Sequence, residues 1–466
     1  MKLTVGLTTS DLKRLSHGSL RFRTSTQARL YQTALPGTAG TRLGALVDSS
    51  SRKELSTAPA GANISIGCVA GGGFTVSVGA RKFNIPADNV LFIDPGLATG
   101  SGSGTLSSLS FTRAGAKGKG SPSYRGAIAV YSGTDAAGGL RAALILDIDD
   151  YLRGVLQSEI PASYHIEAIK AQAVAARTYA LNPRVDHGPD RVNVCDSYLC
   201  CQYFGGLNTN LAGSHRTAID ATSHQILTYD GAPILALFSS NAGGHTESFE
   251  NCFSDIRTNQ FPPQAVPYLR GVSEAFHPSS LVAGQAGTEK YLRTLYSSGV
   301  PPTADAWSHH FKWHVSISAA QLEAHLHNTA AKMLAAAETA PFVIPPASAK
   351  FGHILDISVD KRGVSGSAIE LSIKTRSGEW KVKKELVIRD FFAIPKSSIK
   401  RLKSARFVID ITRTGAGLIS SINLKGRGWG HGVGMQQTGA QGWAKAGRDY
   451  RQILAHYYQG TKIERA

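Results

Sequence analysis

The chain has 466 residues, enough for one large or two medium domains with a buried core. Its 50 Lys and Arg against 33 Asp and Glu give a net charge of +17, which favours an anionic partner. The sequence has no zinc-finger spacing, no aromatic RNA-binding motif and no basic heptad, which argues against nucleic acid as that partner. It has no apolar run of about 18 residues, so we expect no transmembrane segment. No signal peptide is visible, because the first residues lack a continuous apolar stretch.

The predicted fold class is α+β, with a β-rich core, a few helices that form a cleft, and a smaller inserted subdomain. Residues 1–60 are rich in Ser, Thr and Arg with weak periodicity, so we expect a poorly ordered N-terminal region. Short apolar runs between Gly- and Ser-rich loops then predict strands. The core is assigned to 61–266 and 350–466. An amphipathic helical stretch places the inserted subdomain at 267–349.

The segment 151–181 places a glutamate at the end of a helix. Pro161 disfavours helical geometry at the residue before it, so the helix should end at Ser158 or Glu159. The negative end of the helix dipole and partial burial would both raise the pKa of Glu159. A carboxylic acid that stays protonated near neutral pH can protonate a glycosidic oxygen. A solvated glutamate at a helix end is the alternative.

An alanine-rich helix is expected next, from Tyr164 to Leu181, with Ser163 as its N-cap. Lys170 and Arg177 stand two turns apart and share one face of this helix. Taken alone, the two side chains indicate a solvated basic face.

Three cysteines gather within residues 192–206, which read VNVCDSYLCCQYFGG. The spacing from Cys195 to Cys200 or Cys201 could serve a metal, with His187 as a third ligand. A disulfide is the competing interpretation, with Cys252 as a further candidate partner, and buried free thiols are the third. The sequence leaves these three alternatives open.

An apolar run near residue 238 ends in SSNAGGHTE, which by itself is an ordinary turn. The sequence lacks a GxSxG elbow, so a serine nucleophile is not expected.

Near the C-terminus, glycines alternate with larger residues in GRGWGHGVG, residues 426–434. In an extended chain this period of two would put Trp429 and His431 on one face and bare backbone on the other. Bare backbone would let a flat substrate approach, and Trp429 would offer an aromatic surface to a sugar. A phosphate-binding loop is excluded, since no GK[ST] follows. Two short helices are expected after it, the second from Tyr450 to Tyr458 with Asp449 as its cap.

These segments resemble the SpoIID/LytB family of stage II sporulation protein D-like lytic transglycosylases and amidase enhancers. The motifs that carry the resemblance are SEIP at Glu159, the cysteine segment, FSSNAGGHT, and GHGVGMQQTGA at 430–440. Gln436 replaces the usual serine of the last motif. The resemblance runs from about Tyr124 to Ile463.

The resemblance implies that Glu159 is the catalytic acid and base. It also implies substrate-binding roles for other positions: Lys170, Arg177, Ser240, His245, Thr246, Trp429, His431 and Gln437. Some relatives bind zinc at the cysteine segment, here Cys195, Cys200 and His187, although a histidine found there in relatives is Leu199 in this chain. Catalysis would require no cofactor.

The implied activity is cleavage between N-acetylmuramic acid and N-acetylglucosamine in peptide-stripped glycan, with 1,6-anhydro ends. A glycoside hydrolase usually needs two catalytic carboxylates, and in this sequence only Glu159 is a strong candidate. A lytic transglycosylase needs only one catalytic carboxylate. The alternative is a non-catalytic wall-binding modifier or enhancer of an amidase. Either role implies peptidoglycan as the partner and the cell envelope as the location, which conflicts with the missing signal peptide.

Overall fold

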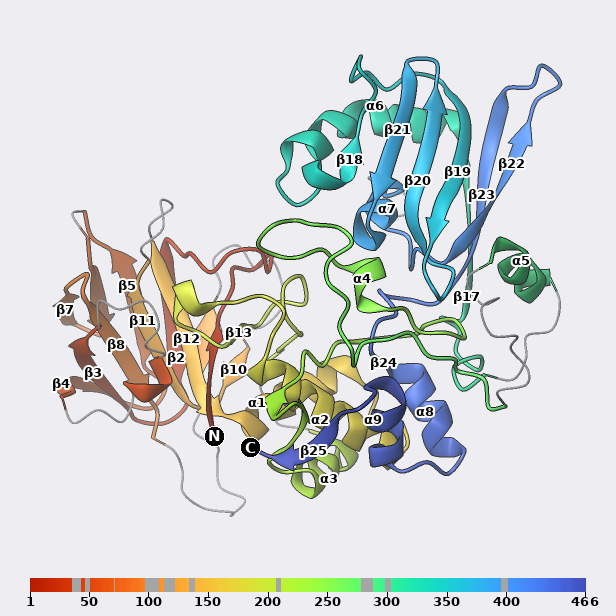
Figure 1. Cartoon of the computed structure of the whole chain (residues 1–466). Coiled ribbons are helices and arrows are strands. Elements are labelled where there is room, and N and C mark those ends of the chain that lie inside the picture. Colours follow the sequence, from red (N-terminus) through yellow and green to blue (C-terminus); the bar gives the residue numbers. More distant parts are fainter. Residues whose placement is uncertain are drawn as a thin grey trace.

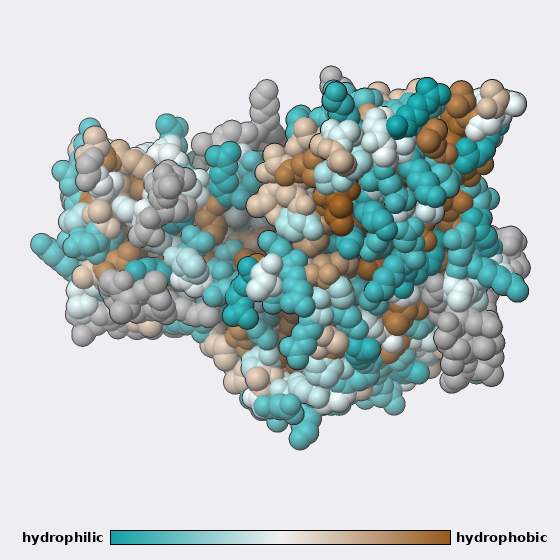
Figure 2. Space-filling model, turned by 45° about the horizontal axis from the view of Figure 1, so that its top comes forward, coloured by the Kyte–Doolittle hydropathy of each residue, from teal (hydrophilic) through white to brown (hydrophobic). Residues whose placement is uncertain are grey.

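The computed structural model describes residues 1–35, 43–46, 51–70, 72–96, 109–112, 122–133, 139–206, 211–277, 288–297, 303–394 and 401–466. Figure 1 shows an N-terminal β-sandwich, a group of helices beside it, and a second body of strands and helices above those helices. This arrangement confirms the predicted α+β class. Hydrophilic side chains cover much of the face in Figure 2. None of the described helices combines the length and the apolar character that a bilayer crossing requires.

The N-terminal sandwich consists of two sheets around a shared apolar interior, and their strands pair antiparallel except for β13, which runs parallel to β1. The first sheet has the order β13-β1-β12-β11-β8-β3-β4 and the second the order β10-β9-β2-β5-β6-β7. Their bounds are β1 Lys2–Gly6, β2 Ser19–Thr24, β3 Ala28–Ala34, β4 Lys53–Ala58, β5 Asn63–Cys68, β6 Phe74–Val78, β7 Arg81–Ile85, β8 Asn89–Asp94, β9 Leu109–Thr112, β10 Ser123–Tyr124, β11 Ala127–Ser132, β12 Leu140–Asp147 and β13 Val194–Cys195.

The structure contradicts the expectation of a poorly ordered region at 1–60, because β1 to β4 lie within it. Part of that region, 36–42 and 47–50, lies outside the described residues. β2 shows why composition misled: its side chains alternate between buried and exposed, with Leu20 and Phe22 inside and Arg21 and Arg23 outside. Basic residues on the solvent face of a strand lower its mean hydropathy without weakening its pairing.

The helical part packs around one buried helix. β12 leads directly into α1, Ile148–Glu159, and α2, Ile166–Leu181, contacts α1, α3, α8 and α9. Alanines dominate α2 and let these neighbours approach closely from all sides. The remaining bounds are α3 Gly213–Ala221, β14 Gln225–Tyr229, β15 Ala232–Pro233, β16 Phe238–Ser239, α4 Phe249–Cys252, β24 Met435–Gln436, α8 Gln437–Lys445, α9 Tyr450–Tyr457 and β25 Lys462–Arg465.

The helices begin and end at the predicted residues in two cases and differ from the prediction in a third. α1 ends at Glu159, as Pro161 predicted, and α9 begins after Asp449, which forms a reciprocal cap with Gln452. α2 begins two residues later than predicted, because His165 is its N-cap: its Nδ1 accepts from the backbone N–H of Glu167 at 3.3 Å.

A second apolar core, separate from the first, is built from residues 313–424. Its sheets have the orders β17-β23-β22 and β18-β21-β20-β19. The bounds are α5 Glu289–Ser297, β17 Lys312–Ser318, α6 Ala319–Ala335, β18 Val343–Ile344, β19 Ile354–Arg362, β20 Ala368–Thr375, β21 Gly378–Lys383, α7 Glu385–Phe391, β22 Phe407–Arg413 and β23 Ile419–Arg427.

The inserted body is therefore larger than the predicted 267–349, and residues 350–427 belong to it rather than to the first core. Leu371 and Trp380 of its sheet share an interior with Leu322 and Leu326 of α6. Leu269 lies in the first core instead. An alternating pattern identifies a strand, but it does not say which sheet the strand joins.

Candidate active site

Glu159 is the last residue of α1, and its carboxylate is held by two neutral groups. The backbone N–H of Tyr203 donates to Oε1 at 3.0 Å, and the amide of Gln437 lies within hydrogen-bonding reach. Burial raises the pKa of Glu159, and these two hydrogen bonds offset part of the rise. The side chain keeps some exposure to solvent. A partly buried carboxylic acid with an open side is suited to proton transfer.

Gln437 reaches Glu159 because it is the first residue of α8, which the central segment of the chain holds in place. β16 and β24 pair in parallel next to this helix. Ser240 accepts hydrogen bonds at its backbone oxygen from the N–H and the hydroxyl of Thr438, both at 3.1 Å. Asn241 Nδ2 donates to Thr438 Oγ1 at 2.8 Å. Three segments far apart in the sequence thus meet at Glu159, with Ser240 acting through its backbone.

Trp429 is 41% exposed and is linked to this part of the fold through Asn241. Its backbone exchanges two hydrogen bonds with Asn241, at 2.8 and 3.1 Å. The Lys403 ammonium stands 4.9 Å from the centre of the indole ring, and the His310 ring meets it edge to face at 4.4 Å. The exposed indole is consistent with the predicted sugar-binding surface.

The glycine ribbon does not have the predicted extended geometry. Gly428, Gly430, Gly432 and Gly434 all have positive φ, between 71° and 108°, a region that favours glycine. Their bare sides face protein. A Cβ on Gly434 would lie 2.1 Å from the backbone oxygen of Leu237. The expectation that this bare backbone admits a flat substrate is wrong at Gly434, because the 237–243 segment fills that space.

Gly434→Ala should therefore lower the free energy of unfolding by at least ~2 kcal/mol, from the positive φ together with the contact at Leu237. Urea titration of the purified variant measures this. Gly213→Ala is the matched control: Gly213 begins α3 with open space around it, so alanine should be neutral or slightly stabilising there. Equal stability of the two variants would contradict this account of the ribbon.

Thr246 of the predicted set is buried, whereas His245 and His431 are half-buried. Burial lowers the pKa of His431 to about 3; its Nδ1 accepts from the N–H of Val433 at 3.0 Å. Burial lowers the pKa of His245 to about 4. Thr246 is 1% exposed and its hydroxyl bonds the backbone of Val272. Its burial contradicts the prediction that Thr246 donates to glycan hydroxyls, and both histidines are neutral at pH 7.

Arg177 is buried, and its guanidinium is fully engaged within the protein. It donates to Asp149 Oδ1 from Nε at 3.0 Å and from Nη2 at 2.7 Å, and its Nη1 donates to the backbone oxygen of Gln225. Arg177 therefore joins α1, α2 and β14, which contradicts its predicted role as a ligand for a substrate carboxylate. Lys170 pairs with Glu167 at 2.7 Å on the partly exposed side of α2.

Arg177→Met is expected to lower the free energy of unfolding by ~3 kcal/mol, because it leaves Asp149 without its cation. Lys170→Met is the comparison, with an expected loss below ~1 kcal/mol for a partly exposed pair. Thermal melting of both variants measures this. A weakened glycan affinity with unchanged melting in Arg177→Met would restore its predicted substrate role.

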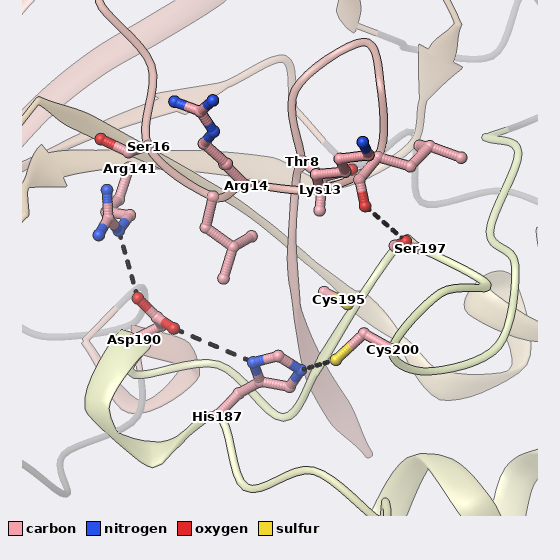
Figure 3. Close-up of a pocket in the computed structure, with 12 residues that line it drawn as sticks. Thr8, Lys13, Arg14, Ser16, Arg141, His187, Asp190, Cys195, Ser197 and Cys200 are labelled. Atoms are coloured by element: carbon pink, nitrogen blue, oxygen red, sulfur yellow. Dashed lines mark hydrogen bonds and ion pairs between the residues drawn. The ribbon is translucent and has the colours of Figure 1, made fainter. Parts of the chain in front are cut away.

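A cluster of sulfur and imidazole ligands lies beside β1 and β13, and three of its members, His187, Cys195 and Cys200, line the pocket in Figure 3. The ligand atoms of His187, Cys195, Cys200 and Cys201 all lie within 4.8 Å of one another. His187 Nε2 is 3.3 Å from both Cys200 Sγ and Cys201 Sγ. Hydrogen bonds from the Cys195 and Cys201 thiols lower the pKa of Cys200 below its ordinary value.

All five cysteines of the chain lie in described residues and are free thiols, so the structure does not contain the predicted disulfide alternative. The sequence interpretation named Cys195, His187 and either Cys200 or Cys201, and the structure brings both of these cysteines into the cluster. Asp190 Oδ2 stands 4.0 Å from His187 Nδ1 and is in turn bound by Arg141 at 3.2 Å. A carboxylate behind a histidine is the usual support of a metal ligand. The adjoining cavity has a volume of about 320 Å³.

Comparison with known proteins agrees with these motifs. Residues 136–229, which contain Glu159 and the sulfur cluster, match the SpoIID family model, described as "Stage II sporulation protein". Residues 256–434 match a model described as a domain of unknown function. Residues 136–229 are thus similar to the SpoIID family, the resemblance that the motifs of the chain predicted.

Three curated relatives are similar to this chain over about two thirds of its length. The Amidase enhancer of Bacillus subtilis is 28% identical over 314 residues, which cover 67% of this chain and 40% of that protein. Stage II sporulation protein D of the same organism is 28% identical over 334 residues, 69% of this chain and 75% of the relative. An uncharacterized protein of Brachyspira hyodysenteriae is 28% identical over 318 residues, 68% of this chain and 67% of the relative. The chain thus spans less than half the length of the amidase enhancer.

Proposed function

We propose that the protein is a peptidoglycan lytic transglycosylase that cleaves the bond between N-acetylmuramic acid and N-acetylglucosamine. The observation that carries the proposal is the setting of Glu159: a partly buried carboxyl with a raised pKa, two neutral hydrogen-bond donors and an open side. No carboxylate is among the groups that shift its pKa. One carboxyl is what this reaction needs, whereas hydrolysis usually needs two.

In the proposed reaction, Glu159 first gives its proton to the glycosidic oxygen as the bond to C1 of the muramic residue breaks. The N–H of Tyr203 and the amide of Gln437 then stabilise the carboxylate that remains. That carboxylate takes the proton of the C6 hydroxyl on the same sugar while the C6 oxygen bonds to C1. The ring closes without added water, and Glu159 is again protonated. Intramolecular attack depends on positioning more than on an activated nucleophile.

We also propose that His187, Cys195, Cys200 and Cys201 hold a zinc ion. Three thiolates and one imidazole are a typical structural zinc set, and the compact grouping of the four ligand atoms fits one ion. Four protein ligands fill a tetrahedral shell, so the ion would support the fold rather than take part in catalysis. The site would tie Cys195, which extends β13 beside β1, to the turn that leads to Tyr203.

A second candidate function is supported by the relative named Amidase enhancer. In that role the protein would bind wall glycan and stimulate a separate amidase without cutting the glycan itself. Both functions place the protein at the cell envelope, and the net charge of +17 suits the anionic polymers found there.

The deciding experiment incubates the purified chain with peptide-free glycan strands, alone and together with an amidase and peptide-bearing wall. Soluble fragments released by the chain alone support the transglycosylase. Stimulated peptide release without such fragments would favour the enhancer and overturn the enzymatic proposal.

A further inference from the structure

Four aromatic side chains of the described residues are well exposed, and two of them, Tyr203 and Trp307, belong to or contact the segments that hold Glu159. Of the five tryptophans, Trp313, Trp380 and Trp443 are at most 5% exposed, whereas Trp307 is 50% exposed and Trp429 is 41% exposed. The exposed tyrosines, Tyr198 at 63% and Tyr203 at 36%, form an edge-to-face pair, and the N–H of Tyr203 binds Glu159. Large aromatic surface that is left exposed within one region of a protein is typical of a ligand-binding groove.

Trp307 stands on a loop, residues 303–311, that is fixed from below. The Asp305 carboxylate is buried and accepts from the N–H of Gly244 at 2.9 Å and from the hydroxyl of Thr303 at 2.8 Å. The loop also rests directly on α8, because a Cβ on Gly442 would lie 1.8 Å from the backbone oxygen of Ala304. A loop held this closely presents its side chains in fixed positions.

The indole of Trp307 touches both segments that build the acid site. Its Nε1 donates to the backbone oxygen of Thr438 at 3.1 Å, next to Gln437. Its ring meets Tyr164, five residues after Glu159, edge to face with 5.8 Å between the ring centres. The Lys445 ammonium stands 5.5 Å from the indole centre. The nitrogen is thus satisfied while half of the side chain remains open.

Trp429 repeats this arrangement at the other end of the loop, where His310 and Lys403 take the places of Tyr164 and Lys445. Each exposed indole therefore has one lysine ammonium close to its ring: Lys445 at Trp307 and Lys403 at Trp429. An indole face packs against the apolar face of a pyranose ring, and an ammonium beside it can pair with a carboxylate on that sugar.

We propose that Trp307, Tyr164 and Lys445 form a second sugar subsite, which binds a carboxylate-bearing N-acetylhexosamine of the same glycan strand that Trp429 contacts. This inference rests on the proposed function, since it extends the glycan-binding cleft of that site. Trp307 supplies the stacking surface and Lys445 the selectivity for the acidic sugar.

Binding is tested in the Glu159→Gln background, so that no turnover is needed, by calorimetry with two oligomers of equal length. One alternates N-acetylglucosamine and N-acetylmuramic acid without peptides, and the other contains N-acetylglucosamine alone. Trp307→Ala should weaken the binding of both oligomers about tenfold, which corresponds to about 1.4 kcal/mol. Trp307→Phe should recover part of the loss, because it keeps an aromatic face.

Lys445→Gln should weaken only the muramic oligomer, and high salt should reduce the difference from the unsubstituted lysine. Lys82→Gln, on an exposed position of β7 in the sandwich, is the charge-matched control and should change neither affinity. Melting curves confirm that each variant is folded.

The outcomes separate the subsite from the catalytic proposal. Binding that depends on Trp307, with no cleavage by the unmodified chain, keeps the subsite and overturns the enzyme. Unchanged affinities in Trp307→Ala, or no binding of either oligomer, would overturn the subsite. Equal weakening of both oligomers by Lys445→Gln would overturn the assignment of an acidic sugar.

Discussion

Glu159→Gln is expected to lower the rate of glycan cleavage by ~100- to 10,000-fold, because glutamine fits the same space but has no proton to give. Its Oε1 can still accept from the N–H of Tyr203, so the local fold should persist. Release of soluble fragments from peptide-free glycan measures the rate. Glu338→Gln, at an exposed position after α6, is the matched control and should keep full activity. Retained activity in Glu159→Gln would remove the basis of the mechanism.

The same variant makes a prediction about stability. Burial raises the pKa of Glu159 in the folded protein, so protonation of this carboxyl stabilises the folded state. This contribution is fully present below the unfolded pKa and is lost as the pH rises through the folded pKa. At neutral pH the variant, which cannot ionise, should melt at or above the temperature of the unmodified chain. That advantage should disappear near pH 4. For the same reason, turnover should fall as the pH rises through the pKa of Glu159.

Cys201→Ser is expected to have a comparably large effect, on metal content and on stability. Apparent binding free energies of structural zinc are ~10–16 kcal/mol at neutral pH, so loss of one of four ligands should markedly lower the free energy of unfolding. Elemental analysis should find one zinc per chain in the unmodified protein and less in the variant, and chelation should lower the melting temperature of the unmodified protein only.

Cys68→Ser is the control for Cys201→Ser, because Cys68 is an exposed thiol on β5, outside the cluster. It should leave zinc content and melting unchanged. One zinc per chain in Cys201→Ser would show that Cys201 is not a ligand. No zinc in protein purified without chelators, with cysteines that resist thiol reagents, would instead indicate buried thiols.

The sequence-based predictions were correct where neighbouring residues determine the structure. Pro161 sets the end of α1 and so the position of Glu159, and Asp449 sets the start of α9. The resemblance implied a substrate-binding role for Gln437, which stays a prediction, and the structure brings its amide within hydrogen-bonding reach of Glu159. Each of these features depends on a few neighbouring residues or on a motif.

The sequence-based predictions failed where the role of a residue depends on which distant segments the fold brings together. Lys170 and Arg177 share one helix face by spacing, yet α2 is wrapped so closely that Arg177 is buried and Lys170 is partly exposed. The spacing allowed Cys200 or Cys201 as a ligand, and the fold gathers both. Trp307 meets Thr438 across 131 residues of sequence, and no local pattern near it predicts that contact.

The central claim is that Glu159 drives an intramolecular ring closure, and the chemistry of the product ends tests it most directly. Peptide-free glycan should be digested in water labelled with heavy oxygen, and the new ends analysed by mass spectrometry. We expect 1,6-anhydromuramic ends that are lighter than hydrolytic ends by one water and carry no label. Reducing ends that carry heavy oxygen would mean that water attacks C1, and would contradict the account.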